Sequence, residues 1–182
     1  MKLTDLIHYT GWEIIPKEIK IIFMQPTFKI ISAKKLIGHH ITMSLTDNKT
    51  FALFSGFMPK RFEIKNFVSP DIFCLKTYSS DYFNNFDPTR TFEKWALMEV
   101  NDHNTIPNGM TSFEIPEGLY AVFHYKGLNT DHSIFTYIFR DWLPNSEYVL
   151  DDRPHFDIMG VKYKNNDPES EEDIYIPVKK KI

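Results

Sequence analysis

The sequence predicts an α+β fold in which two similar strand–helix–strand–strand modules lie side by side in one domain. Three observations predict it. The chain has 182 residues, 42% of them hydrophobic, which is enough for one full core and too little for two. After an N-terminal extension the chain divides into halves of matching pattern, at about 27–107 and 113–178. Apolar and polar residues alternate in the strand-like stretches and so define two faces in each half.

The N-terminal extension, residues 1–26, precedes a predicted domain over 27–182. It holds a short predicted helix around Lys17–Phe23. It is too short for a helix-turn-helix unit with its supporting core. We therefore expect no DNA-binding arm here. Its Trp12 would suit packing against the domain that follows.

Four blocks of the first half recur in the same order in the second. A strand at Leu36–His40 matches Leu119–Phe123, 83 residues further on (119 − 36). A helical stretch closes at Phe57-Met58-Pro59 and again at Trp142-Leu143-Pro144, 85 residues further on (144 − 59). Two strands complete each module, at 72–78 and 95–100 in the first half and at 157–163 and 173–178 in the second. The shared order indicates a tandem duplication.

Alternation in the strands predicts which side chains face the helices. Two apolar trios match between the halves, and we expect both to pack on helices: Ala96, Met98 and Val100, and Ile174, Ile176 and Val178. The opposite face mixes acids with aromatic residues, namely Trp95, Leu97, Glu99, Glu171, Asp173, Tyr175 and Pro177. In the strand before, Phe156 and Ile158 are expected to face the helices. Asp157 then falls on the opposite face, in apolar company.

Several motifs together resemble the GyrI-like family, the small-molecule effector-binding domains found also in AraC-type regulators. The second half carries them as Gly118-Leu119-Tyr120-Ala121, Trp142-Leu143-Pro144, Pro154-His155-Phe156-Asp157 and the acidic-aromatic strand 171–178. The first half is similar to a subgroup through Phe92-Glu93-Lys94-Trp95-Ala96. The resemblance implies a pseudo-twofold pair of modules whose antiparallel sheets face a central ligand groove, opposite the helices. Relatives line this groove with rings and carboxylates and bind bulky, lipophilic, often cationic compounds.

The expected function is therefore drug sensing or sequestration by a free-standing, non-enzymatic domain that binds lipophilic small molecules, with cations favoured. Aromatic faces attract a cation while their apolar area removes hydrocarbon from water, and a carboxylate supplies the counter-charge. The candidate carboxylates are Glu99, Asp157, Glu171 and Asp173, and the candidate rings are Trp95, Tyr120, Trp142 and Tyr175.

Structural roles compete with several of these assignments. Glu99 could instead form an ion pair with a lysine or arginine, and Trp142 could belong to the core at a helix end. Glu171 and Asp173 lie near the acidic run 167–173, which is also typical of a solvated edge.

Two other functions stay open. In a hydrolase, as among relatives that open cyclopropane-bearing toxins, Glu99 would act as the catalytic general base and Tyr120 would steady the leaving group. In an interaction module, the domain would inhibit a larger protein partner.

Composition bounds the remaining possibilities. The formal net charge of −3 predicts no direct binding to nucleic acid. The chain has no apolar run of membrane-spanning length and no secretory leader pattern, so we expect a cytoplasmic protein with no membrane partner. Cys74 is the single cysteine, and the seven histidines lack metal-ligand spacing, so we expect no metal and no cofactor. A haem ligand would rest on His124 alone.

Overall fold

The computed structural model describes residues 24–85 and 87–181. The helix expected around Lys17–Phe23 lies outside the described residues, as does the rest of the chain up to residue 23. The first half holds β1 (Thr27–Ile31), β2 (Lys34–Met43), α2 (Thr50–Phe57), the short 3₁₀ turn η3 (Arg61–Glu63), β3 (Ile72–Thr77) and β4 (Phe92–Val100). β5 (Thr111–Ile115) leads into the second half.

The second half repeats this order. It holds β6 (Gly118–Lys126), a continuous helical stretch, β7 (Tyr148–Leu150), β8 (His155–Met159) and β9 (Glu171–Lys180). The helical stretch consists of α3 (Ser133–Thr136), the π-helical η4 (Tyr137–Trp142) and α4 (Leu143–Asn145). α2 ends just before Pro59, which has no backbone N–H to continue the helical hydrogen bonds, whereas Pro144 lies within the last helical turn, one residue before α4 ends at Asn145. The predicted strand–helix–strand–strand modules are confirmed.

The strands form one antiparallel sheet in the order β1-β6-β9-β8-β3-β4-β2-β5, with β7 added beside β9. β3 and β8, the equivalent strands of the two halves, are neighbours at its centre, and their middle residues Cys74 and Asp157 lie opposite each other. This antiparallel pairing of equivalent strands is the local signature of a pseudo-twofold axis.

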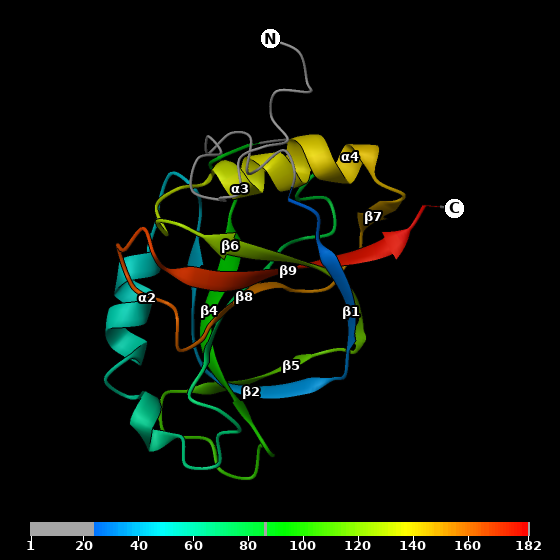
Figure 1. The fold of residues 1–182 in the computed structure, drawn as a ribbon. Coiled ribbons are helices and arrows are strands. Elements are labelled where there is room, and N and C mark those ends of the chain that lie inside the picture. Colours follow the sequence, from blue (N-terminus) through cyan, green and yellow to red (C-terminus); the bar gives the residue numbers. More distant parts are fainter. Residues whose placement is uncertain (1–23, 86, 182) are drawn as a thin grey trace, which may run out of the picture.

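Two short connections force the sheet to curl. β1 and β2 lie near opposite ends of the strand order, yet Ile31 and Lys34 can be at most about 11 Å apart. The step from Ile115 to Gly118 joins β5 to β6 in the same way. Figure 1 shows the result, a sheet curved around an interior, with α2 and the α3–α4 stretch on its outside. We call the side toward the interior the inner face and the helix-covered side the outer face.

One glycine permits the tight pairing of β2 with β4. A Cβ added at Gly38 would lie 2.0 Å from the carbonyl oxygen of Ala96, a backbone atom that cannot turn away. A side chain at this position would push the two strands apart, so glycine allows the close approach.

Two clusters fill the outer face, one beneath each helix. The first packs α2 against Ala96, Met98 and Val100. The second packs the α3–α4 stretch against Ile174, Ile176 and Val178. Both predicted helix-facing trios are therefore confirmed.

The prediction for β8 was wrong. The strand covers His155–Met159 rather than 157–163, because the chain turns at Gly160, whose carbonyl accepts a hydrogen bond from the Tyr163 N–H. Phe156 pairs with Leu75, so both side chains lie on the inner face, not against the helices. Asp157 consequently lies on the outer face.

Candidate functional site

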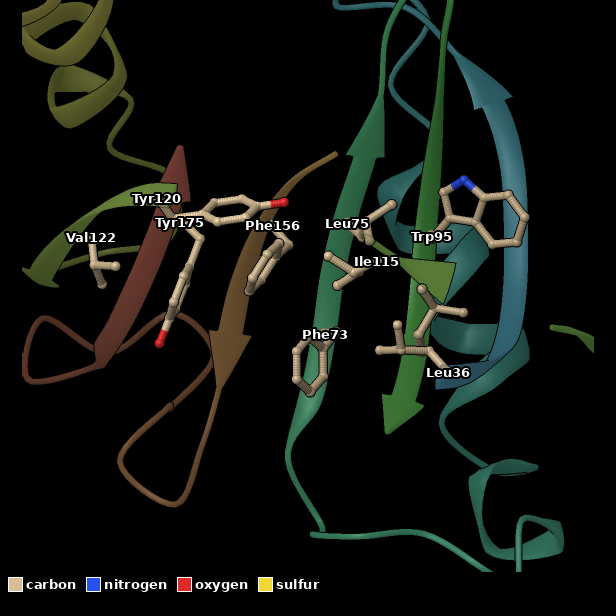
Figure 2. Close-up of a cluster of buried hydrophobic side chains, with 10 residues drawn as sticks. Leu36, Phe73, Leu75, Trp95, Ile115, Tyr120, Val122, Phe156 and Tyr175 are labelled. Atoms are coloured by element: carbon tan, nitrogen blue, oxygen red, sulfur yellow. The ribbon is translucent and has the colours of Figure 1, made fainter. Parts of the chain in front are cut away.

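The inner face brings together aromatic rings from both halves of the chain. Trp95 on β4, Tyr120 on β6 and Tyr175 on β9 belong to one buried cluster with Leu36, Phe73, Leu75, Leu97, Ile115, Val122 and Phe156, each at most 7% exposed. Figure 2 shows Tyr120, Tyr175 and Phe156 on one side, with Trp95, Leu36 and Ile115 on the other. Phe156 stacks on Tyr175 at 4.5 Å between ring centroids and lies 5.3 Å from Tyr120. Three of the four predicted rings thus share one face.

Trp95 carries an unsatisfied polar atom. Its ring stacks on His40 at 4.2 Å and contacts Phe113 at 4.8 Å. The indole Nε1–H is buried, and no hydrogen-bond acceptor contacts it within the part of the chain that the structure describes. A buried donor without a partner costs roughly 1–3 kcal/mol, so the position has a free hydrogen bond to offer an acceptor.

Glu99 lies on the same face of β4, about 13 Å beyond Trp95 along the strand. Both of its carboxylate oxygens accept hydrogen bonds from Lys34 Nζ, each at 2.9 Å. The side chains of Glu99 and Lys34 are 20% and 22% exposed. Glu99 therefore has the lysine partner that the sequence left as an alternative, and it retains contact with solvent.

Tyr120 has its hydroxyl group engaged. The hydroxyl donates to the carbonyl oxygen of Pro154 at 3.3 Å, and the guanidinium of Arg153 lies over the ring at 4.6 Å from its centroid. Burial raises the pKa of Tyr120 to about 12, so the phenol stays protonated at neutral pH. The ring face, rather than the hydroxyl, is what Tyr120 offers.

Asp157 and Trp142 lie on the outer face, which corrects their predicted location. Asp157 accepts a hydrogen bond from Lys76 at 2.5 Å, and this ion pair is what keeps a carboxylate beneath the helices. Trp142 packs edge-on against Phe123 at 5.0 Å in the core beneath the second helical stretch. Asp157 lies on the outer face because the alternation of β8 was assigned to the wrong side of the sheet. Trp142 lies there because it is part of the core at a helix end, the alternative that the sequence left open.

Glu171 and Asp173 lie at the start of β9 and form a surface network. Asp173 is 2.8 Å from His124 Nδ1, and Glu171 is 3.3 Å from His124 Nε2. A hydrogen bond from Lys162 at 2.8 Å lowers the pKa of Glu171. Asp173 is two residues from Tyr175 on the same strand face, so the network borders the aromatic cluster without entering it.

Sequence reasoning missed Phe156, Phe73 and Lys34 as inner-face residues. A signal for the first two existed, because the 83-residue spacing that relates Leu36 to Leu119 also relates Phe73 to Phe156. Applied to this strand, it would have placed Asp157 with Cys74 instead. Lys34 gave no such signal, since its pairing with Glu99 depends on the register of β2 against β4.

A cavity of about 750 Å³, which we call the β7–β8 cavity, lies apart from the inner face, between the segment after β3 and the β7–β8 connection. Near-parallel rings of Phe83, Phe139 and His155 form one wall, with centroids 5.4–6.0 Å apart. Burial, and the nearby charge of Lys76, lower the pKa of His155 to about 3, so this histidine is neutral. None of the predicted rings or carboxylates lines this cavity.

Two further features of the described residues bear on function. They contain no group of three or more histidine, cysteine, aspartate or glutamate side chains arranged to hold a metal ion. None of their helices combines the length and apolar character that crossing a bilayer needs.

Comparison with known proteins gives a family. A family model described as integron-associated effector binding protein matches residues 29–178. No curated protein matches the sequence.

Solved structures share the fold at low sequence identity. The EcmrR C-terminal domain superposes with a TM-score of 0.65 at 16% identity, covering 87% of this chain and 99% of that domain. EcmrR in its DNA complex has a TM-score of 0.64 at 16% identity over 91% of this chain, which spans only 61% of the EcmrR chain.

Two other structures are similar. SAV2435 bound to tetraphenylphosphonium has a TM-score of 0.57 at 15% identity, covering 86% of this chain and 94% of that one. A hydrolase encoded by lin2189 from Listeria innocua has a TM-score of 0.58 at 12% identity, covering 90% and 97%.

Proposed function

The chain belongs to the family of integron-associated effector binding proteins, and from that membership we propose that it binds lipophilic small molecules, with cations favoured, on the inner face of its sheet. Drug sensing or sequestration is the role that follows. The observation that carries the proposal is that Trp95, Tyr120 and Tyr175 share one face with the carboxylate of Glu99. Rings and a carboxylate on one surface suit a ligand with hydrocarbon and positive charge. The structure of SAV2435 holds tetraphenylphosphonium, which combines hydrocarbon with positive charge but has no N–H donor.

Two further observations support a ligand at this face. The Trp95 N–H has no acceptor among the residues that the structure describes, so an acceptor on a ligand would give it a hydrogen bond. The surrounding rings pack on one another, so a ligand that separates them exchanges ring–ring contacts for ring–ligand contacts. Binding should therefore be accompanied by a local opening of the inner face.

The test uses two compounds of matched size, the cation 4-phenylbenzylammonium and neutral 4-phenylbenzyl alcohol. Calorimetric titration should give saturable binding of the cation. Glu99→Gln should lower the affinity for the cation by at least about 10-fold and leave the affinity for the alcohol within about 2-fold of its wild-type value. The reason is that a charge-assisted hydrogen bond is lost only with the cation. An equal loss of affinity for both compounds would show that the charge of Glu99 does not contribute to binding.

A control variant distinguishes binding at the inner face from binding in the β7–β8 cavity. Phe83→Ala removes a ring from that cavity wall and leaves the inner face intact, so binding should persist. If Phe83→Ala abolishes binding while Tyr175→Ala does not, the ligand occupies the β7–β8 cavity and the proposed site is wrong.

The hydrolase alternative finds less support at this face. Both oxygens of Glu99 accept from Lys34, which disfavours the carboxylate as a general base, and the hydroxyl of Tyr120 donates to Pro154. The carboxyl group with a pKa raised to about 7 is that of Glu172, raised by burial and by the charge of Asp157. Its strand alternation puts Glu172 on the outer face with Ile174. Product analysis after the titration tests turnover directly, since recovered, unaltered ligand argues against it.

A further inference from the structure

Two of the inner-face groups that suit a cation, Glu99 and the Tyr175 ring, are already contacted by a lysine of the chain itself. Lys34 Nζ holds the two oxygens of Glu99 at 2.9 Å each, and Lys29 Nζ lies 5.7 Å from the centroid of the Tyr175 ring. The two lysines come from β2 and β1, on either side of the short connection that brings the ends of the sheet together. The protein therefore supplies its own cations to these two groups.

The contact of Lys34 with Glu99 is the stronger of the two. It is a two-point, charge-assisted interaction between side chains that are about one-fifth exposed, and such bonds are roughly twice as strong as neutral ones. Ile115 pairs with Lys34 across β2 and β5, and Leu36 pairs with Glu99 across β2 and β4, so apolar residues flank the ion pair. A ligand cation has to displace the Lys34 ammonium before it can reach the carboxylate.

Displacement of Lys34 costs the same for every cation, but cations differ in how far they restore the hydrogen bonds that are lost. Two hydrogen bonds to Glu99 are lost when Lys34 leaves, and only an incoming group with N–H donors can restore them. A quaternary ammonium or a phosphonium carries charge but no donor, so it leaves both carboxylate oxygens without hydrogen bonds. The freed Lys34 keeps its hydration, since its long side chain already reaches solvent.

We propose that Lys34 is a built-in competitor for Glu99 that weakens the binding of every cation, so that the site takes cations whose N–H donors replace the two lost hydrogen bonds, such as protonated amines and amidines. This inference rests on the proposed function, because it assigns the ligand class of the same site. Lys34 thus sets the affinity that a cation must exceed, and the N–H donors of the ligand decide which cations exceed it.

The test compares 4-phenylbenzylammonium with its N,N,N-trimethyl derivative, which has the same rings and charge but no N–H donor. Calorimetric titration of the wild-type protein should show the primary ammonium binding at least about 10-fold more tightly. In Lys34→Met both compounds should gain about 10-fold in affinity, because neither has to displace the lysine, and the ratio of the two dissociation constants should stay near its wild-type value. Lys34→Arg, which keeps two donors on Glu99, should retain the wild-type affinities.

Lys35→Met is the matched control. Lys35 is exposed on the adjacent position of β2 and faces the other side, so its loss should leave both affinities unchanged. A thermal unfolding curve for each variant shows whether it is folded under the titration conditions, and Lys34→Arg reports on the competitor even if Lys34→Met is not.

The outcomes separate the two ideas. If both compounds bind every folded form and Lys34→Met leaves both affinities unchanged, the role of Lys34 is wrong and the proposed function stands. If neither compound binds the wild-type protein or any variant, the proposed function fails and the inference fails with it.

Discussion

Lys76 on β3 donates a hydrogen bond to Asp157 on β8 at 2.5 Å, so an ion pair joins the two halves of the chain at the centre of the sheet. Both side chains are largely buried on the outer face, at 13% and 10% exposed. Burial alone would lower the pKa of Lys76, but the Asp157 carboxylate outweighs it and raises that pKa above its ordinary value.

Asp157→Asn should destabilise the protein by about 3 kcal/mol, because it leaves the Lys76 ammonium buried without its counter-charge. Urea denaturation at pH 7 measures the change. Asp152→Asn, at an exposed position nearby, should be neutral. A loss below about 1 kcal/mol for Asp157→Asn would contradict the buried pair. Replacing both partners, as Lys76→Met with Asp157→Leu, should recover much of the stability.

His155 should make the protein sensitive to acid. Its pKa is lowered from 6.5 to about 3 by burial, so the unfolded chain binds a proton that the folded protein does not. This contribution to stability is complete above pH 6.5 and is lost as the pH falls toward 3, by up to about 1.4 kcal/mol per pH unit. His155→Phe should remove that part of the slope. Urea denaturation between pH 7 and 4.5 compares the two proteins, and parallel curves would refute the assignment.

The two described tryptophans should report differently on binding. Trp95 lies on the inner face and Trp142 on the outer face. Trp95→Phe should remove most of the fluorescence change caused by 4-phenylbenzylammonium, whereas Trp142→Phe should preserve it. The opposite pattern would move the ligand to the helix-covered side.

Gly38→Ala should destabilise the protein by roughly 1–3 kcal/mol, since the added methyl group would overlap the Ala96 carbonyl oxygen and push β2 from β4. Gly56→Ala in α2 is the control, because its nearest new neighbour is His39 Nδ1 at 3.9 Å. That change should be neutral or stabilise by up to about 1 kcal/mol, as expected for glycine in a helix. Thermal unfolding of both variants checks the pair, and equal effects would argue against the close approach.

The sequence predicted the fold further than the site. Periodicity predicted the repeated order of the elements, the helix ends near Pro59 and Pro144, and the helix-facing trios. The pattern occurs twice in the chain, once in each half, so each half supports the prediction for the other. The family resemblance is confirmed by the match over residues 29–178.

Strand β8 shows what periodicity alone cannot predict, namely which of its two faces lies against the helices. Both of its faces are covered, one by helices and one by the curled sheet, so alternation divides Phe156 from Asp157 but does not say which side is which. The pairing of Lys34 with Glu99 lies further out of reach, because it joins residues 65 positions apart through a register that only the folded sheet defines.

The middle of the sheet also has an evolutionary consequence. Two identical copies of the second module, paired as β3 and β8 are, would set one Asp157 directly against another, and like charges opposite each other repel. In the single chain the position opposite Asp157 is Cys74, and Lys76 supplies the counter-charge. Covalent fusion of two equivalent modules therefore released each from the constraint of self-complementarity. The same release lets Glu99 stand on one half of the inner face and Tyr175 on the other, so the two halves present different chemical groups to the interior.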